Sequence, residues 1–197
     1  GGDHSSPLGL IRAFSKRQSF GILQIDAHMD LRDSYEGFKC SHASIMFNAL
    51  KEEGVTSLTQ VGIRDFCEEE EEYLANSAKP IHVCYDERIF NETINGTSWR
   101  DQVDKVVNSL PEHVYISFDM DGLDPSLCPQ TGTPVPGGLQ FNQSIYLIEQ
   151  VVRAGKIILG FDVCETGYSS WDANVASRIL YRLAACAGVS NGLLSFR

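Results

Sequence analysis

The sequence predicts an α/β fold with three layers, in which helices cover both faces of a mainly parallel β-sheet. Apolar runs of strand length recur along the chain, most clearly at 20–25 and 113–118. Segments whose apolar residues have helical spacing separate these runs, and strands that alternate with helices form parallel sheets covered on both sides. Acidic clusters follow the runs, at the position where open α/β sheets bind their ligands. Functional side chains are therefore expected at the ends of strands.

The expected elements follow one another with short connections. Leu8, Ile11 and Phe14 give 7–17 a helical spacing, and Gly54 lies where a glycine commonly ends a helix. The other expected helices are 42–53, 99–110, 141–154 and 171–187, and the expected strands are 20–25, 58–63, 81–84, 113–118, 157–161 and 192–196. Segments 31–39, 91–98 and 125–138 are expected to be loops. Five glutamates at 68–72 predict a solvated helical face rather than a metal or Ca²⁺ site, because consecutive helical residues point in every direction.

Composition limits the possible partners. The 197 residues suffice for one ordinary domain, and 26 acidic against 16 basic residues give a net charge of −10. This charge argues against nucleic acid or a membrane surface as a partner and fits a cationic substrate or bound metal ions. Six cysteines without a C-x-x-C pair indicate reduced thiols. Neither a signal peptide nor an apolar run of about 20 residues is present in the sequence, which predicts a soluble, cytoplasmic protein.

The motif Ile25-Asp26-Ala27-His28-Met29-Asp30 follows the first apolar run. If the backbone stays extended through it, the side chains of Asp26, His28 and Asp30 share one face. Carboxylates held close together raise each other's pKa unless a cation lies between them. The motif therefore predicts a metal site.

A second cluster repeats this arrangement after the run 113–118. Asp119 and Asp121 stand two residues apart, and the following segment 125–138 is rich in Pro, Gly and Thr, as in a rigid loop that walls a site. Asp124, which precedes Pro125, is expected to brace that loop. Helix capping or loop hydrogen bonding is the alternative role for these carboxylates, but two similar clusters favour metal ions.

The motifs GGDHSS, DAHMD and SFDMDGLDP followed by TGTPVPGG resemble the three signature motifs of the ureohydrolase family, which includes arginase, agmatinase and formimidoylglutamase. The resemblance spans the whole chain and implies an arginase-like fold, with residues 1–197 as a single catalytic domain. The stretch DLRDSYEGFKCSHAS and the later VGIR are most similar to agmatinases.

The resemblance implies two Mn²⁺ ions per chain. One would be held by His4, Asp26, Asp30 and Asp119, and the other by Asp26, His28, Asp119 and Asp121, so that Asp26 and Asp119 bridge the pair. It also places Glu165 as the carboxylate that pairs with a guanidinium group and His42 as the residue that shuttles a proton. Asp162 is the other acidic residue after the strand 157–161, and it is expected to hold the loop that follows this strand rather than to bind the substrate.

The reaction implied is hydrolysis of a guanidine or amidine C–N bond by a hydroxide that two Mn²⁺ ions share and that Asp30 orients. Agmatine, which would give putrescine and urea, is the preferred substrate because a dication suits an acidic chain. Formimidoylglutamase or another guanidino-acid hydrolase is the alternative, in which Arg32 would clamp the acidic tail instead of pairing with Asp33 or Glu36. A non-catalytic regulatory or assembly subunit is a further alternative.

Two features separate this chain from the family pattern. Family members carry strands before the GGDH motif, so the chain is expected to be truncated at its N-terminus, with an open sheet edge. The run Thr166-Gly167-Tyr168-Ser169-Ser170 also differs from the usual continuation after Glu165. By resemblance, a homo-oligomer, trimeric or hexameric, is expected.

Overall fold

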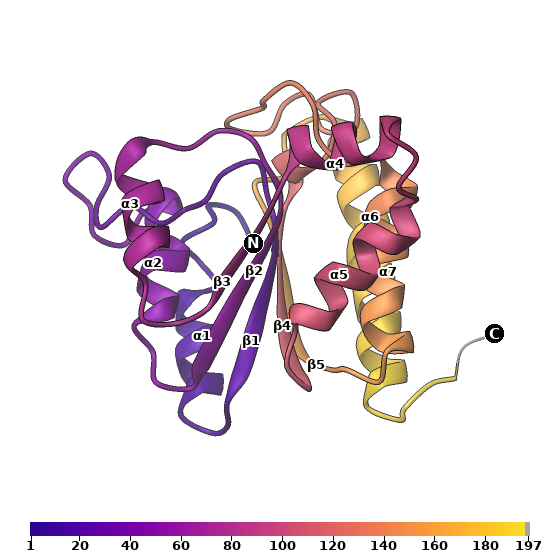
Figure 1. Cartoon of the computed structure of the whole chain (residues 1–197), viewed down its shortest axis with the longest axis horizontal. Helices are drawn as coiled ribbons and strands as arrows, with labels where there is room; N and C mark the ends of the chain where they lie inside the picture. Colours follow the sequence, from indigo (N-terminus) through magenta and orange to yellow (C-terminus); the bar gives the residue numbers. More distant parts are fainter. Residues whose placement is uncertain (196–197) are drawn as a thin grey trace.

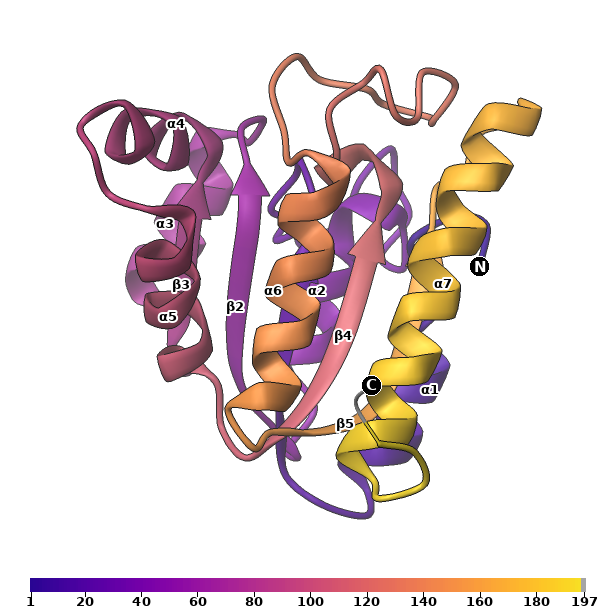
Figure 2. The same cartoon turned by 90° about the vertical axis from the view of Figure 1, so that its right-hand side faces the viewer.

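A parallel β-sheet of five strands forms the middle layer of this computed structural model, which describes residues 1–195 (Figure 1). The strands are β1 Phe20–Ile25, β2 Val55–Ile63, β3 Ile81–Tyr85, β4 His113–Asp119 and β5 Ile157–Cys164. Their order is β3-β2-β1-β4-β5, and every pairing is parallel. All the strands therefore present their carboxyl ends at the same edge of the sheet (Figure 2). The expected α/β/α fold is confirmed.

Helices cover the two faces of this sheet. The helices are α1 Leu8–Ser15, α2 Ile45–Leu50, α3 Glu68–Asn76, α4 Asp86–Ile94, α5 Trp99–Ser109, α6 Phe141–Arg153 and α7 Ser170–Ser190, with short 3₁₀ turns η1 His42–Ser44 and η2 Met120–Gly122. Helices α1 to α3 lie on one side of the sheet, and α4 to α7 lie on the other (Figure 1). Among the described residues, no helix is both long and apolar enough to span a membrane.

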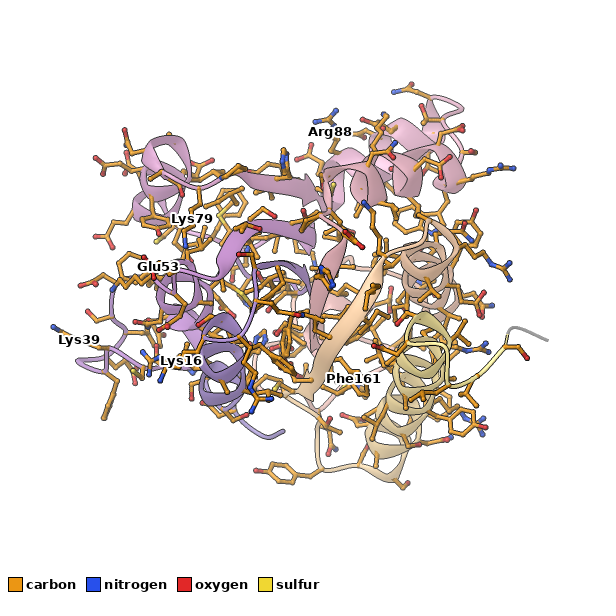
Figure 3. The ribbon with its side chains drawn as sticks, turned by 90° about the horizontal axis from the view of Figure 1, so that it is seen from below. Lys16, Lys39, Glu53, Lys79, Arg88 and Phe161 are labelled. Carbon is orange, nitrogen blue, oxygen red and sulfur yellow. The ribbon has the colours of Figure 1, made fainter. Side chains whose placement is uncertain are left out.

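The two faces have separate hydrophobic cores. On the face under α1 and α2, residues such as Ile11, Ile22 and Met46 pack together, and on the other face Leu23, Val107 and Leu147 belong to the larger core. The side chains of β1 are buried on both faces, which explains its continuous apolar run. Viewed along the sheet, the side chains fill the space between the layers, with Phe161 of β5 against the larger core (Figure 3).

The structure corrects four element boundaries. Residues 91–94 belong to α4 and not to a loop, because Ile89 packs into the core and Thr93 hydrogen-bonds back to the Ile89 carbonyl. The helix expected over 42–53 is a 3₁₀ turn followed by α2, which ends at Leu50. Strand β5 continues to Cys164, so Asp162 lies within the strand. The strand expected over 192–196 is wrong for 192–195, which form turns, and Phe196 lies outside the described residues.

The turn after β4 packs tightly against the end of β1 at Gly122. A Cβ atom at this position would lie 2.6 Å from the Asp26 amide nitrogen and 2.9 Å from the Ile25 carbonyl carbon. Both neighbours are backbone atoms, so they cannot move aside without shifting a strand end. Gly122 therefore sets how closely the carboxyl ends of β1 and β4 approach.

We expect Gly122→Ala to lower the free energy of unfolding by about 1–3 kcal/mol, since the added methyl group must displace backbone. Urea denaturation measures this change. Gly9→Ala is the control, because a Cβ atom there meets open space on α1 and should stabilise the helix by about 0.5–1 kcal/mol. Equal stability of Gly122→Ala and the wild type would contradict the proposed close approach.

Candidate metal centre

Four carboxylates and two histidines meet at the carboxyl ends of β1 and β4. One half of this group is built around His4, whose Nδ1 atom lies 3.1 Å from an oxygen of each of three aspartates, Asp26, Asp30 and Asp119. His4 and these three aspartates are at most 5% exposed. Residues far apart in the sequence thus place one nitrogen and three oxygens around a single point.

The other half is built around His28. Its Nδ1 atom lies 3.1 Å from Asp121 Oδ2 and 3.5 Å from Asp26 Oδ1. Asp26 therefore reaches both halves, with Oδ2 directed at His4 and Oδ1 directed at His28. We call the six residues the candidate metal centre: His4, Asp26, His28, Asp30, Asp119 and Asp121.

The donor atoms of the candidate metal centre fit divalent cations. His4 Nδ1 is buried, and no described residue is placed to make a hydrogen bond with it, although three carboxylate oxygens lie close by. Cations with metal–oxygen distances of about 2.1 Å in octahedral geometry keep neighbouring ligand atoms about 3 Å apart, which is the spacing found here. The four carboxylates carry four negative charges when ionised, and two divalent cations would balance them.

Without a cation, the group is electrostatically unfavourable. Burial and the negative charge of Asp26 raise the pKa of Asp30 to about 8. Burial, Asp26 and Asp121 raise the pKa of Asp119 well above its usual range. Burial alone would lower the pKa of His28, but Asp121 and Asp26 raise it to about 11. Protons on Asp30 and Asp119 thus take the role that cations would have, because buried like charges this close to Asp26 disfavour the ionised form of both groups.

A left-handed backbone turn, and not an extended strand, directs Asp30 into the centre. Strand β1 ends at Ile25, and Asp30 has a φ angle of 56°. Few residues other than glycine adopt this conformation, although aspartate does so more readily than most. The carbonyl of Asp30 accepts hydrogen bonds from the backbone N–H groups of Met46 and Phe47, both at 3.1 Å, so α2 fixes the turn. The expected convergence of Asp26, His28 and Asp30 is found, but the extended geometry expected for it is wrong.

The second aspartate pair also departs from extended geometry. Asp119 ends β4, whereas Asp121 lies in the turn η2, where its backbone N–H donates to Asp119 Oδ1 at 2.9 Å. Asp121 in turn accepts hydrogen bonds from the Ala27 backbone N–H at 3.0 Å and the Thr133 hydroxyl at 3.2 Å. The turn therefore connects the ends of β1 and β4 to the loop 125–138.

Glu165 lies beside His4 in a second left-handed turn. Its φ angle is 56°, and its Oε1 atom accepts the backbone N–H of His4 at 2.8 Å. The Thr131 hydroxyl donates to the carbonyl of Glu165 at 2.6 Å. A Cβ atom on Gly132 would lie 3.2 Å from Oε2, so glycine leaves the second carboxylate oxygen uncrowded. Burial raises the pKa of this half-buried carboxyl group above its usual value.

His42 lines a small cleft whose walls also include residues of the candidate metal centre. The cleft has a volume of about 150 Å³, and its walls include His28, Asp30, His42, Asp65 and Thr133. His42 begins the turn η1, and its Nδ1 atom lies 3.4 Å from Asp3 Oδ2. The sequence offered no signal for this partner, because Asp3 belongs to a motif 39 residues earlier in the chain.

Glu70 is the exception to the predicted solvated acidic helix, since the other four glutamates of 68–72 are exposed as expected. Its side chain is only 3% exposed, and it accepts the backbone N–H groups of Leu31 and Cys67, each at 3.0 Å. Arg32 Nε lies 3.7 Å from Glu70 Oε2, and its guanidinium group lies over the Tyr35 ring, 5.4 Å from the centroid. Arg32 thus interacts with Glu70 rather than with Asp33 or Glu36, the two surface partners expected from the sequence.

Two further carboxylates have clear partners. Asp124 accepts hydrogen bonds from the backbone N–H and the hydroxyl of Ser126, which confirms its bracing role. Asp162, expected to hold the loop, instead accepts hydrogen bonds from the Ser117 hydroxyl and the Cys164 thiol. The difference arises because β5 extends beyond Asp162 and pairs it with Ser117 of β4.

Arg64 is a residue whose importance sequence reasoning missed. Its guanidinium group donates to the carbonyls of Asp121 at 2.7 Å, Leu123 at 3.2 Å and Val135 at 3.0 Å. It therefore ties η2 to the loop 125–138. The sequence signals for it were a cation directly after the apolar run of β2 and its place as the last residue of the VGIR stretch.

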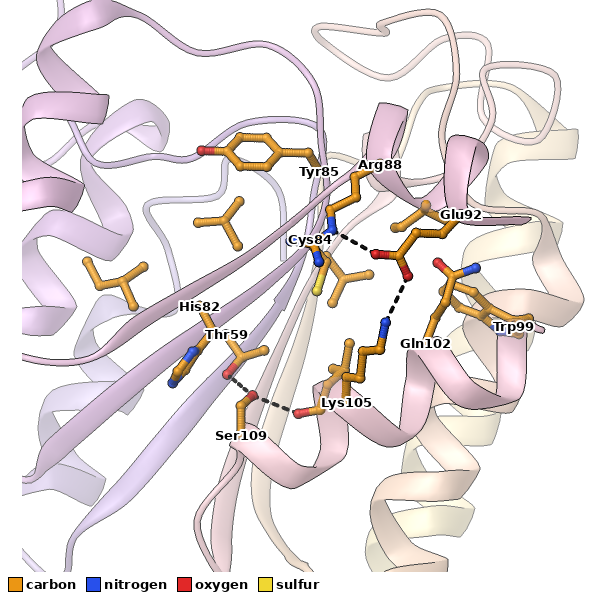
Figure 4. A pocket seen from close by; sticks show the side chains of 15 residues that line it. Thr59, His82, Cys84, Tyr85, Arg88, Glu92, Trp99, Gln102, Lys105 and Ser109 are labelled. Carbon is orange, nitrogen blue, oxygen red and sulfur yellow. Dashed lines mark hydrogen bonds and ion pairs between the residues drawn. The ribbon is translucent and has the colours of Figure 1, made fainter. Parts of the chain in front are cut away.

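A larger cavity lies elsewhere in the fold. It has a volume of about 320 Å³ and lies between β3 and helices α4 and α5 (Figure 4). Its charged side chains neutralise one another, since Glu92 pairs with Arg88 at 2.8 Å and with Lys105 at 3.0 Å. Its walls contain no residue of the candidate metal centre. The small cleft at the strand ends is therefore the better functional site.

Similar proteins share this arrangement of strands and motifs. N(1)-aminopropylagmatine ureohydrolase of Thermus thermophilus is 35% identical over 99% of this chain, and the chain covers 64% of that protein. Agmatinase of Pyrococcus horikoshii is 34% identical over 84% of the chain and 52% of its own length. The crystal structure of agmatine ureohydrolase of Thermoplasma volcanium superimposes with a TM-score of 0.77 at 30% identity, covering 98% of this chain and 63% of that one.

The chain thus spans about two thirds or less of the length of these relatives. Residues 1–186 match the arginase family as a whole, and this match includes every residue of the candidate metal centre. The agreement of sequence, fold and site shows that the chain belongs to the arginase family.

Proposed function

We propose that the protein is a binuclear metal hydrolase that cleaves the guanidine C–N bond of a small cationic substrate, with agmatine as the preferred substrate. The observation that carries this proposal is the position of Asp26, whose two oxygens reach the two histidines of the centre. A shared carboxylate creates two adjacent cation sites. The relatives described as agmatinase and aminopropylagmatine ureohydrolase support the substrate class.

The ligand set favours Mn²⁺. Carboxylate oxygens suit Mg²⁺, Ca²⁺ and Mn²⁺, whereas imidazole suits first-row transition metals, and Mn²⁺ accepts both kinds of donor. His4, Asp26, Asp30 and Asp119 would hold one ion, and Asp26, His28, Asp119 and Asp121 would hold the other. Divalent cations in such a site acidify water toward neutral pH, which is the chemistry that hydrolysis of a C–N bond requires.

The side chains around the centre then provide binding and proton transfer. Glu165 has one carboxylate oxygen fixed by the His4 backbone and the other beside Gly132, so it can pair with the planar guanidinium group of a substrate. Asp30 can accept a hydrogen bond from the attacking water and orient it. His42, which lines the cleft, can carry a proton to the departing amine. Asp3 faces the Nδ1 atom of the His42 ring and helps to hold the ring in place.

The charge of the cleft favours a cationic tail over an acidic one. Asp30, Asp65 and Glu70 line the cleft, and its single arginine, Arg32, already faces the carboxylate of Glu70. A substrate carboxylate would have to compete with Glu70 for Arg32. Formimidoylglutamate and guanidino acids are therefore the weaker candidates.

We also propose that residues 1–197 form one catalytic domain. The Gly1 amine donates to the Val163 carbonyl at 2.9 Å, and the Glu165 N–H donates to the Gly2 carbonyl at 2.8 Å. These hydrogen bonds hold the segment that carries His4 against the end of β5, so two segments far apart in the chain contribute to the same site.

For metal content, we expect Asp26→Ala to lose most of both ions and Asp121→Ala to lose mainly one, because Asp26 reaches both histidines whereas Asp121 reaches His28. Elemental analysis after Mn²⁺ loading and desalting measures the ions per chain, with about two for the wild type. Asp124→Ala is the control, since its carboxylate braces a loop beside the centre. Equal metal loss in Asp26→Ala and Asp121→Ala would refute the bridging role, and a metal-free wild type would favour the non-catalytic alternative.

For the reaction, we expect urea release from agmatine in the presence of Mn²⁺, measured on the full-length protein. Glu165→Gln should lower kcat/KM by about 100-fold, because a neutral amide cannot pair with the guanidinium charge, while metal content stays unchanged. Failure of the full-length protein to hydrolyse agmatine, arginine, guanidinobutyrate or formimidoylglutamate would disprove the proposed activity.

For substrate charge, we expect Arg32→Ala to leave kcat/KM for agmatine within about threefold of the wild type, because the guanidinium group of Arg32 already pairs with the carboxylate of Glu70. Lys51→Ala, which removes a cation paired with Asp33 outside the cleft, is the matched control. A loss of about tenfold or more on formimidoylglutamate alone, together with faster turnover of that substrate than of agmatine in the wild type, would reverse the choice of substrate.

A further inference from the structure

Four polar side chains form a line across the sheet directly below the candidate metal centre. The parallel registers pair Gln60 with Gln24, Gln24 with Ser117, and Ser117 with Asp162. The line thus crosses β2, β1, β4 and β5 at one level. We call these four residues the polar row.

The polar row is unusual for its surroundings. Gln24, Gln60 and Ser117 are fully buried, on the sheet face that packs against α1 and α2. The neighbouring positions on that face, such as Ile22 and Tyr115, are part of a hydrophobic core. Two of its atoms, Gln60 Oε1 and Asp162 Oδ2, are buried without a hydrogen-bond partner among the described residues, and each such atom costs about 1–3 kcal/mol. The position of the row, two residues before Asp26 and Asp119 on their strands, suggests what it does.

One end of the polar row fixes His4. The Ser117 hydroxyl lies 2.8 Å from His4 Nε2, and its Oγ atom lies 3.2 Å from Asp162 Oδ1. For Nδ1 to offer its lone pair to a cation among the carboxylates, Nε2 must carry the ring proton and donate it to Ser117. The hydroxyl then donates to Asp162 Oδ1. This chain of hydrogen bonds selects the tautomer and the ring orientation of His4.

The other end of the polar row fixes Asp26. The side-chain amide of Gln24 donates to Asp26 Oδ2 at 2.8 Å and to the His28 carbonyl at 3.3 Å. The amide of Gln60 donates to Gln24 Oε1 at 2.6 Å, which orients the Gln24 amide with its N–H group toward Asp26. Gln60 also donates to the Met29 carbonyl at 2.7 Å. The carboxylate that reaches both histidines is therefore held from below.

We infer that the polar row is a positioning layer, in which Ser117 and Asp162 set His4 for one ion and Gln24 and Gln60 set Asp26 for both. This inference rests on the metal centre of the proposed function. The two ends of the polar row contact different ligands, so substitutions at the two ends should change the metal affinity in different ways. Ser117 and Asp162 control the affinity of the ion that His4 binds, whereas Gln24 controls the affinity of the pair.

The test is a titration of the metal-free protein with Mn²⁺ by isothermal calorimetry, in which stepwise affinities are measured without turnover. We expect Ser117→Ala and Asp162→Ala to lower the affinity for one of the two Mn²⁺ ions by about 10–100-fold. Asp162→Asn should restore the affinity to within about threefold of the wild type, because its amide oxygen still accepts from Ser117. Gln24→Leu should lower the affinity for both ions.

Thr59→Val is the matched control. Thr59 is a fully buried strand residue like Ser117, but its hydroxyl pairs with that of Ser109 at 2.9 Å on the opposite face of the sheet (Figure 4). Thr59→Val should have a lower free energy of unfolding than the wild type and the same affinity for Mn²⁺. If Ser117→Ala binds both ions as tightly as Thr59→Val, the positioning role is wrong while the metal centre stands. If the wild type binds no Mn²⁺, both the proposed function and this inference fail.

Discussion

Repulsion among four buried carboxylates is the constraint on which the rest of the structure depends. Asp26, Asp30, Asp119 and Asp121 lie around two histidines in a region that water barely reaches. In such surroundings, charges interact strongly, and unpaired carboxylates take up protons instead of ionising. The fold therefore has to bring them together against their own electrostatic preference. Strands, turns and the polar row provide the stabilising contacts.

The sheet topology explains why the carboxylates meet where they do. From β1, the order runs outward through β2 and β3 on one side, and through β4 and β5 on the other. The connections thus leave β1 and β4 in opposite directions, and a crevice forms between their carboxyl ends, as in other open parallel sheets. Asp26 follows β1, and Asp119 ends β4, so each borders this crevice. Gly122 lets the turn after β4 pack closely against the end of β1, which keeps both aspartates at this crevice.

The sequence was sufficient for the layers of the fold, for the central strands and for the grouping of Asp26, His28, Asp30, Asp119 and Asp121 after two of those strands, because strand ends and buried apolar runs leave local patterns. His4 was indicated only by the family resemblance. It was insufficient where a residue's role depends on a distant partner. Asp30 and Glu165 reach their positions through left-handed turns, which helix α2 and Thr131 stabilise from elsewhere in the chain. Glu70 looked like one of five equivalent glutamates, and only the packing of the segment 31–39 above it makes it buried.

The same distinction would separate metal binding from substrate selection. Strand register and the polar row hold the candidate ligands from below. The cleft above is lined by loop residues and by Glu70 of α3, which Arg32 faces. Loop residues can change without disturbing the sheet, because few core contacts depend on them. On the proposed function, this division would let the metal ligands stay the same while the substrate tail varies, and the pairing of Arg32 with Glu70 would be the contact that favours a cationic tail.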